Sequence, residues 1–206
     1  MIQLLPITTQ ASPYWDSLVR IYHDSFPIDE QRPVESIARL IVEEPRYTLY
    51  AIVNAIGSWP LAIGGSPDSS NSFENENRQK PTANSQNPIG LLTTWHFDEF
   101  TYIEHFAINT ELRSQGYGSK AISTLIKQKE NPIVLEAEPP TDELTRRRIR
   151  FYERQGLTLY DFHYLQPAYT EASQPVELRL MGTLDTNATT LTDVSNTLHR
   201  EVYGAF

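Results

Sequence analysis

The stretch that most constrains the fold of this chain runs from Tyr102 to Glu130. Its first part, 102–108, is rich in aromatic and β-branched residues, a composition typical of a strand. Residues 109–114 carry turn-forming side chains. Beyond Gly116 the apolar residues recur at helical spacing: Ala121, Ile122, Leu125 and Ile126. The stretch therefore predicts a strand, a sharp turn and a helix.

The turn contains two glycines one residue apart, Gly116 and Gly118, within the segment RSQGYG at 113–118. Glycine lets the backbone approach a ligand closely, and a helix that begins here presents unpaired N–H groups. The positive end of the helix dipole adds to this, so the turn favours a phosphate or pyrophosphate. Two other nucleotide-binding loops do not fit, because the Gly-Lys spacing of a Walker loop and the third glycine of a Rossmann fingerprint are both absent.

The rest of the chain alternates strand-like and helix-like segments. Strands are expected near 1–7, 47–55, 89–97, 100–108, 132–138, 157–165 and 176–183. Helices are expected near 15–26, from Pro33 to Ile41, after Gly116, at 144–155 with Thr141 or Asp142 as the cap, and at 190–203. This order predicts an α/β fold in a single domain over 1–206. The last helix either packs on the body or meets another subunit, which leaves a homodimer open.

Residues 57–88 interrupt the pattern with a long run of Ser, Asn, Gln, Glu and Pro. Such a segment cannot bury enough apolar surface to offset the entropy lost on ordering it. We therefore expect a flexible polar insertion in a hairpin loop that would ordinarily be short.

Composition narrows the class of protein. The formal net charge of −9 disfavours non-specific binding to nucleic acid and is compatible with a cationic substrate such as an amine. No apolar run reaches the roughly 18 residues of a membrane span, and the N-terminus lacks a secretory pattern. Cysteine is absent, which removes disulfides, thiolate metal sites and a cysteine nucleophile. We expect a cytoplasmic protein with no metal, no nucleic-acid partner and no membrane association.

The turn motif resembles the acetyl-CoA loop of the GCN5-related N-acetyltransferase (GNAT) superfamily. That loop is written Arg/Gln-x-x-Gly-x-Gly/Ala, and Arg113, Gly116 and Gly118 match it in full. Downstream, residues 150–157 (RFYERQGL) resemble the family's second signature, a helix that ends in Tyr-Glu-x-x-Gly-Phe. The resemblance covers 89–165 firmly and 1–55 loosely.

The resemblance implies a mixed, twisted sheet of about seven strands with helices on both faces. It places acetyl-CoA, as co-substrate, where two central parallel strands splay apart, here around Phe106 and Leu135. It also implies that the segment 25–32 borders the acceptor pocket. The residues implied to bind acetyl-CoA belong to the strand end, the loop and the second signature: Phe106, Ala107, Ile108, Arg113, Ser114, Gln115, Gly116, Tyr117, Gly118, Ser119 and Tyr152.

Acetyl transfer to an amine requires a base, and two carboxylates are the principal candidates. Glu136 lies where the family's ribosomal-protein alanine acetyltransferases carry their base. Glu104 lies in the strand where histone-modifying members carry theirs, although their position matches Tyr102. We favour Glu136, whose pKa burial would raise toward neutrality, and keep open Glu104 and the alternative that neither acts. His105 is expected on the face opposite Glu104, in a structural role.

Protonation of the departing thiolate is assigned to Tyr152, which falls on the family's helix tyrosine near the cofactor sulfur. A phenol with a pKa of about 10 can donate this proton. Many members carry an asparagine where this chain has Thr145, so contacts there depart from the pattern. The arginines of the same helix either bind the cofactor's 3′-phosphate or form a solvated face paired with carboxylates.

Taken together, the sequence predicts an acetyl-CoA-dependent N-acetyltransferase. It would transfer the acetyl group directly to a primary amine of a small molecule or a protein N-terminus, because a thioester needs no covalent enzyme intermediate. The alternative from another class is a non-catalytic acyl-CoA sensor or interaction module on the same fold.

Overall fold

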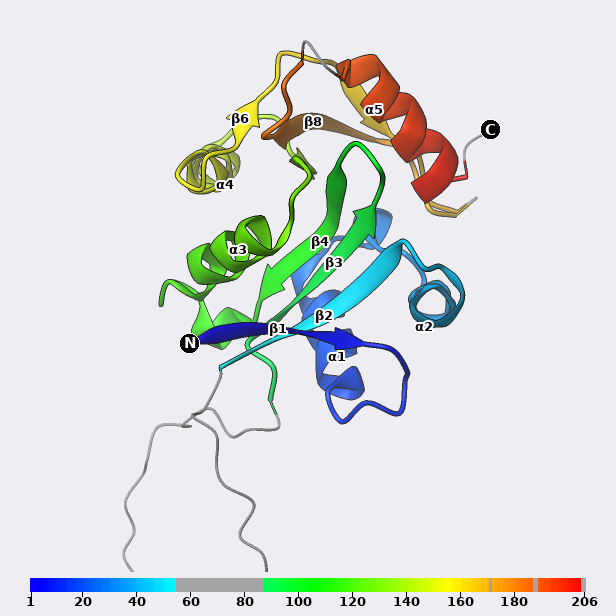
Figure 1. Cartoon of the computed structure of the whole chain (residues 1–206), viewed down its shortest axis with the longest axis vertical. Helices are drawn as coiled ribbons and strands as arrows, with labels where there is room; N and C mark the ends of the chain where they lie inside the picture. Colours follow the sequence, from blue (N-terminus) through cyan, green and yellow to red (C-terminus); the bar gives the residue numbers. More distant parts are fainter. Residues whose placement is uncertain (55–86, 171, 187–188, 205–206) are drawn as a thin grey trace, which may run out of the picture.

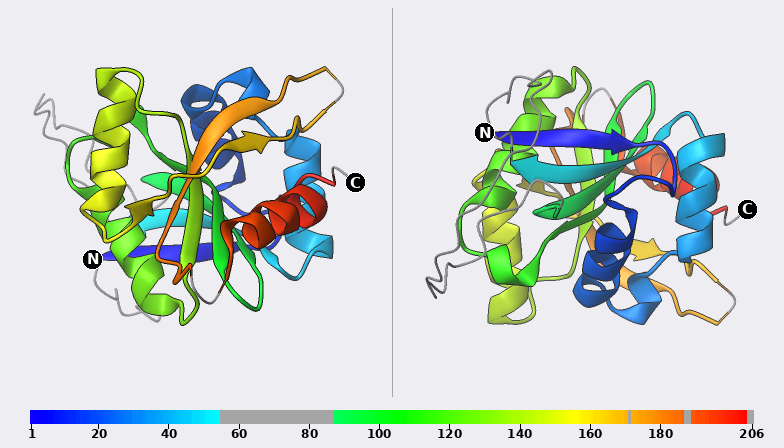
Figure 2. Two further views of the ribbon diagram at one scale, coloured as in Figure 1. Left: turned by 90° about the horizontal axis from the view of Figure 1, so that it is seen from above. Right: turned by 90° about the horizontal axis from the view of Figure 1, so that it is seen from below.

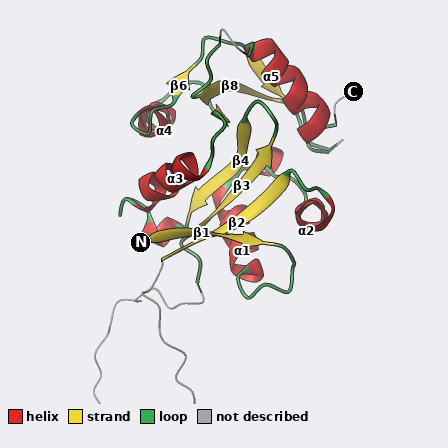
Figure 3. Cartoon of the chain, in the orientation of Figure 1, coloured by secondary structure: helices red, strands yellow, loops and turns green. Residues whose placement is uncertain are grey.

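The computed structural model describes residues 1–54, 87–170, 172–186 and 189–204. The expected polar insertion at 57–88 lies outside the described residues except for its last two positions. In the described part, a twisted sheet lies between two groups of helices (Figure 1, Figure 3).

The sheet has eight described strands in the order β1-β2-β3-β4-β5-β8-β6, with β7 paired on β8. One half consists of β1 (Ile2–Ile7), β2 (Tyr47–Asn54), β3 (Gly90–His96) and β4 (Thr101–Ile108). The other half consists of β5 (Ile133–Ala137), β6 (Thr158–Leu159), β7 (Tyr164–Gln166) and β8 (Val176–Gly182). The predicted mixed α/β sheet is confirmed, with one short strand more than expected.

Among the described strands, only β4 and β5 form a parallel pair. Their pairing runs from Thr101↔Ile133 to Ile103↔Leu135 and stops there, although β4 continues to Ile108. The carboxyl-terminal ends of the two central strands therefore diverge, as expected. Main-chain groups that face the opening between them have no partner in the sheet ladder.

Helices cover both faces of the sheet (Figure 2). On one side lie α1 (Trp15–Ser25), the short helix η1 (Ile28–Glu30) and α2 (Val34–Glu43). On the other side lie α3 (Tyr117–Gln128), reached through the short helix η2 (Thr110–Leu112), and α4 (Glu143–Glu153). Each face has its own hydrophobic core, and the side chains of β4 and β5 divide between the two.

The C-terminal helical segment packs on the body. It consists of α5 (Leu191–Thr197) followed by a π-helical turn, η3 (Leu198–Val202). Val194, Leu198 and Val202 are buried in the same core as α1 and α2. Of the two alternatives for this helix, the structure shows the intramolecular one.

One predicted element is wrong in its extent. The segment 157–165, expected as one strand, forms two short strands, β6 and β7, that both pair with β8. Between them the Phe162 N–H donates to the Tyr160 carbonyl oxygen (2.9 Å), which closes a tight turn and breaks the ladder. An apolar composition alone does not report such a turn.

Candidate active site

The glycine turn forms the N-terminus of α3, directly after the end of β4. Gly116 caps the helix in the left-handed conformation (φ 78°), which glycine adopts without strain. The first hydrogen bond within the helix runs from the Lys120 N–H to the Gly116 carbonyl (3.2 Å). The N–H groups of residues 117–119 therefore have no acceptor within the helix and are available to an anion.

Two side chains hold this turn in place. The Arg113 guanidinium donates to the Ile108 carbonyl (3.0 Å) and to the Ser25 hydroxyl (3.4 Å), which ties the turn to the end of β4 and to α1. Gln155, just beyond α4, donates to the Ser119 hydroxyl (3.3 Å). The turn thus connects to both helical layers at the end of the sheet where β4 and β5 separate.

The end of β4 directs main-chain donors into the opening. The N–H groups of His105 and Asn109 point to β3, where they donate to Thr93 Oγ1 (2.9 Å) and to the Ile89 carbonyl (2.8 Å). Successive N–H groups alternate along a strand, so those of Phe106 and Ile108 point to the β5 side, where pairing has ended. These are the groups expected to hold a pantetheine arm.

A β-bulge at Glu104 changes the register of β4. Ile103 pairs with Thr94 and His105 pairs with Thr93, so Glu104 is the additional residue. As a result Glu104 and His105 both face α1, and their side chains approach to 3.9 Å. The expectation that they point to opposite faces is wrong, because simple alternation does not hold across a bulge.

His105 is a structural histidine, as expected. Its ring nitrogens lie 3.1 Å from the Tyr22 hydroxyl and 3.3 Å from Thr93 Oγ1. Burial lowers its pKa more than the neighbouring Glu104 carboxylate raises it, so the ring is neutral at physiological pH.

Glu104 is fully buried, and its carboxylate is saturated with donors. Arg32 donates to Oε1 through Nε (2.8 Å) and Nη2 (2.7 Å), Tyr169 donates to the same oxygen (2.9 Å), and Trp95 donates to Oε2 (2.9 Å). Burial alone would raise the pKa of Glu104, but the Arg32 charge and the hydrogen bonds outweigh it and hold the pKa below its ordinary value. The carboxylate is ionised and occupied.

Glu136 lies in a different environment. The Tyr203 hydroxyl donates to Oε2 (2.9 Å), whereas Oε1 is buried and has no hydrogen-bond partner among the described residues. Burial raises the pKa of Glu136 to about 7, against the lowering effect of the hydroxyls of Tyr164, Tyr203 and Tyr102. A buried carboxyl that titrates near neutrality and has neutral hydroxyls beside it can accept a proton at physiological pH.

Tyr152 lies on α4, in the core shared with α3. Burial raises its pKa to about 12, partly offset by Arg148, so the phenol is protonated.

The start of α4 explains the departure at Thr145: this residue and Asp142 form a capping box, in which the Thr145 N–H donates to Asp142 Oδ1 (2.8 Å). Thr145 is thus committed to the helix end.

The arginines of α4 pair mainly with neighbours on the surface. Arg148 forms an ion pair with Glu138, and Arg150 donates to Glu143 (2.5 Å). Arg146 donates to the Thr141 carbonyl (3.1 Å). For Arg148 and Arg150, the alternative of a solvated face paired with carboxylates describes the structure, whereas Arg146 has a main-chain partner.

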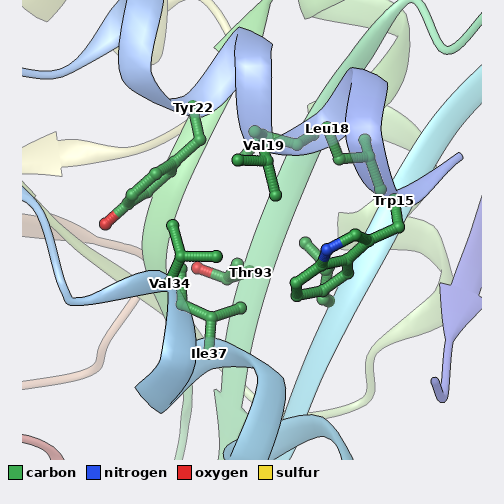
Figure 4. A pocket seen from close by; sticks show the side chains of 9 residues that line it. Trp15, Leu18, Val19, Tyr22, Val34, Ile37 and Thr93 are labelled. Carbon is green, nitrogen blue, oxygen red and sulfur yellow. The ribbon is translucent and has the colours of Figure 1, made fainter. Parts of the chain in front are cut away.

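A small apolar hollow lies on the face of the sheet covered by α1 and α2 (Figure 4). Trp15, Leu18 and Val19 of α1 face Val34 and Ile37 of α2 across it. Apart from Tyr22 and Thr93, whose hydroxyls are engaged by Arg32 and His105, its lining is apolar. The hollow belongs to the packing of this face and offers no group for acyl transfer.

The structure brings most of the predicted residues to one region and adds others. The turn at 113–119 and the ends of β4 and β5 surround the opening, with Glu136 and Tyr152 in the cores on opposite faces of the sheet. Sequence reasoning missed Trp95, Tyr169 and Tyr203, and it considered Arg32 only as part of the segment 25–32. No local motif marks these residues, since their contacts span more than 60 positions of the chain in three of four cases.

Among the described residues, no group of three or more His, Cys, Asp or Glu side chains could hold a metal ion. In the same part of the chain, none of the helices has the length and apolar character needed to cross a membrane.

A twisted sheet whose central parallel strands diverge in front of a glycine-capped helix defines the fold class of the GNAT acetyltransferases. Residues 15–157 match the sequence profile of the acetyltransferase (GNAT) family, and the chain belongs to this family. The solved structure of a GNAT-family protein from Bacteroides thetaiotaomicron is 31% identical, with a TM-score of 0.76, and the match covers 98% of each chain.

Two further matches are more limited. Arabidopsis thaliana NAA60, solved in complex with acetyl-CoA, is 15% identical with a TM-score of 0.58, over 90% of this chain and 99% of that one, a likeness that shows the fold alone. The Bacillus subtilis protein YjbC is 41% identical over 67 residues, which are 32% of this chain and 34% of YjbC. The chain thus matches only about a third of this relative's length.

Glu136→Gln is expected to change stability in a pH-dependent way. The folded-state pKa of about 7 lies above the ordinary 4.5, so the folded protein holds this proton more tightly than the unfolded chain. The stability that this bound proton contributes is fully present below pH 4.5, the ordinary pKa. It is lost as the pH rises through about 7, the folded-state pKa. From about pH 4.5 to about pH 8 the unfolding free energy of wild type should fall by about 2–4 kcal/mol relative to the variant, measured by urea denaturation.

The control is Glu104→Gln, which leaves the buried Arg32 without its ionised partner. It should destabilise the protein by about 3–5 kcal/mol at every pH from about 6 to about 8, because the pKa of Glu104 is lowered and the carboxylate stays ionised over this range. A pH-independent difference for Glu136→Gln would contradict the neutral-range pKa of Glu136.

Proposed function

We propose that the protein is an acetyl-CoA-dependent N-acetyltransferase that transfers an acetyl group directly to a primary amine. The observation that carries this proposal is the divergence of β4 and β5 in front of the N-terminus of α3, where the N–H groups of residues 117–119 have no helical acceptor. One place thus offers donors for a diphosphate and an opening in the sheet for an acyl chain.

In this proposal the N–H groups of the turn bind the diphosphate of acetyl-CoA. Family membership and the Arg113, Gly116 and Gly118 motif support this assignment. The N–H groups of Phe106 and Ile108, directed into the opening, hold the pantetheine and polarise the thioester carbonyl.

Glu136 is the proposed base. Its buried Oε1 lacks a partner among the described residues, and its pKa of about 7 suits proton acceptance at physiological pH. Glu104 is the weaker candidate, because its oxygens already accept from Arg32, Trp95 and Tyr169 and its pKa is lowered. To act as the base, Glu104 would first have to lose its buried ion pair with Arg32.

The proposed reaction balances without a metal or a covalent intermediate. The amine nitrogen bonds to the thioester carbonyl carbon, the carbon–sulfur bond breaks, and the electron pair leaves with sulfur. The amine proton passes to Glu136, directly or through water, and the Tyr152 phenol donates its proton to the thiolate.

Binding of the donor is the first test. Titration calorimetry with acetyl-CoA should show saturable binding, and Gly116→Ala should weaken it about tenfold, since a β-carbon there would crowd the diphosphate. A β-carbon at Gly116 meets no protein atom within 4 Å, so the loss would not arise from a clash within the chain.

Gly204→Ala is the matched control for this experiment. Gly204 also has a positive φ (63°) and no atom within 4 Å of an added β-carbon, so the backbone strain is comparable. This variant should bind acetyl-CoA like wild type. Absence of binding by folded wild-type protein would overturn the proposed function.

Tyr152→Phe should reduce turnover by about tenfold or more, because the thiolate loses its proton donor. Acetyl-CoA affinity should stay nearly unchanged, since the ring and its packing remain. The rate is measured as thiol release with a panel of primary amines. The control is Tyr50→Phe, because Tyr50 packs against the same core as Tyr152. An unaltered rate for Tyr152→Phe would remove this residue from the mechanism.

Glu136→Gln should lose activity by about 100-fold near neutral pH and recover in part under alkaline conditions, where solvent deprotonates the amine. The measurement is the pH dependence of thiol release with an amine that turns over. If Glu104→Gln showed the alkaline recovery instead, Glu104 would be the base. Binding of acetyl-CoA without turnover on any amine would support the sensor alternative.

A further inference from the structure

We propose that Tyr203 is a positioning residue for Glu136, and that the buried Arg32–Glu104 ion pair holds Tyr203 in place. This inference rests on the proposed function, in which Glu136 accepts the proton of the amine. It gives a role to the C-terminal segment and to the carboxylate that does not act as base.

The first contact is the hydrogen bond from the Tyr203 hydroxyl to Glu136 Oε2 (2.9 Å). The Tyr102 hydroxyl lies 2.9 Å from that of Tyr203. A phenol has a single O–H, which Tyr203 directs to the carboxylate, so Tyr102 must donate to the Tyr203 oxygen. The two hydroxyls thus form a chain of donors directed at Oε2.

The second contact anchors the backbone beside Tyr203. Arg32 Nη2 donates to Glu104 Oε1 (2.7 Å) and also to the Val202 carbonyl (2.9 Å). The Arg32 side chain is 11% exposed and that of Glu104 is 0% exposed, so this charge-assisted bond lies in a region of low dielectric. The residue immediately before Tyr203 is therefore fixed relative to β4.

The third contact fixes the tyrosine ring. Tyr169 packs against the ring of Tyr203, with centroids 5.1 Å apart, and its hydroxyl donates to Glu104 (2.9 Å). The Tyr169 ring also contacts Arg32, whose guanidinium carbon lies 4.7 Å from the ring centroid. The same ion pair thus supports Tyr203 through its backbone and through its ring.

The helical turn that carries Tyr203 is itself unusual. The Tyr203 N–H donates to the Leu198 carbonyl (3.2 Å), which closes the π-helical turn η3. Such turns are rare and recur at functional sites. Leu198 and Val202 anchor it in the core, and the wider turn sets the direction in which residue 203 leaves the helix.

Among the described residues, five ionisable groups interact with Glu136, and one of them is Tyr169, on the segment after β7. Tyr102 and Glu104 come from β4, Tyr164 comes from β7, and Tyr203 follows η3. The hydroxyls of these last three tyrosines lower the pKa of Glu136, and the negative charge of Glu104 raises it. Removal of one hydroxyl therefore shifts the balance toward the protonated acid.

Tyr203→Phe tests the first step, because it deletes one oxygen and keeps the ring. The carboxyl resonance of Glu136, followed by NMR in protein labelled with ¹³C-glutamate and assigned through Glu136→Gln, should show a pKa that rises by about 0.5 to 1. With an amine that turns over, the acidic limb of the pH–rate profile should move by the same amount.

Tyr160→Phe is the matched control. It removes a buried hydroxyl of the same core that contacts the Leu184 main chain and neither Glu104 nor Glu136, and it should leave the Glu136 titration in place. An unshifted titration in Tyr203→Phe, or an equal shift in Tyr160→Phe, would overturn the positioning role. The titration needs no acceptor, so it separates failure of this inference from failure of the proposed function.

Arg32→Lys tests the anchor. A lysine keeps the positive charge but cannot donate to Glu104 and Val202 through a planar fork. It should raise the Glu136 pKa in the same direction as Tyr203→Phe, and the double variant should show no further rise, as expected for two residues on one path. Additive shifts would show that Arg32 acts independently of Tyr203. If Arg32→Lys does not fold, the same comparison is made with Tyr169→Phe, which changes no charge and removes the hydroxyl that joins the Tyr203 ring to Glu104.

Discussion

The parallel pairing of β4 and β5 ends after Ile103 and Leu135, and the rest of the site follows from this interruption. Sheet strands ordinarily satisfy each other's main-chain groups, so an early end of pairing leaves donors that require another partner. Here those donors face an opening that lies beside the N-terminus of α3, whose first N–H groups are also without helical acceptors. One break in a ladder thus creates a polar lining in the middle of an otherwise apolar fold.

Two buried glutamates beside this opening have opposite properties for physical reasons that the structure makes clear. Glu104 is paired with the positive charge of Arg32 and accepts several hydrogen bonds, so its ionised form is favoured although the side chain is buried. Glu136 receives neutral hydroxyls only, which offset burial incompletely, and its pKa rises to about 7. A buried ion pair contributes little net stability in most proteins, which fits a role of Arg32 and Glu104 in positioning the C-terminal segment.

Local patterns predicted much of the fold and part of the site. The glycine turn, the helices and most of the strands depend on spacing within short windows, and these expectations were confirmed. The predictions that were wrong concern places where one residue alters the register: the bulge at Glu104, which turned His105 to the same face, and the turn at Tyr160 that divided one expected strand into two. Neither leaves a periodic signal, because each depends on hydrogen bonds to other strands.

The sequence by itself determined the family, the position of the glycine turn and the residue types available for proton transfer, since all of these lie in contiguous segments. The tertiary structure alone decided which glutamate is paired with a charge and which is surrounded by neutral hydroxyls, because the deciding partners are remote. Arg32 is 72 positions from Glu104, and Tyr203 is 67 positions from Glu136. The protonation state of a buried carboxyl depends on what surrounds it in space, and folding assembles those surroundings from distant parts of the chain.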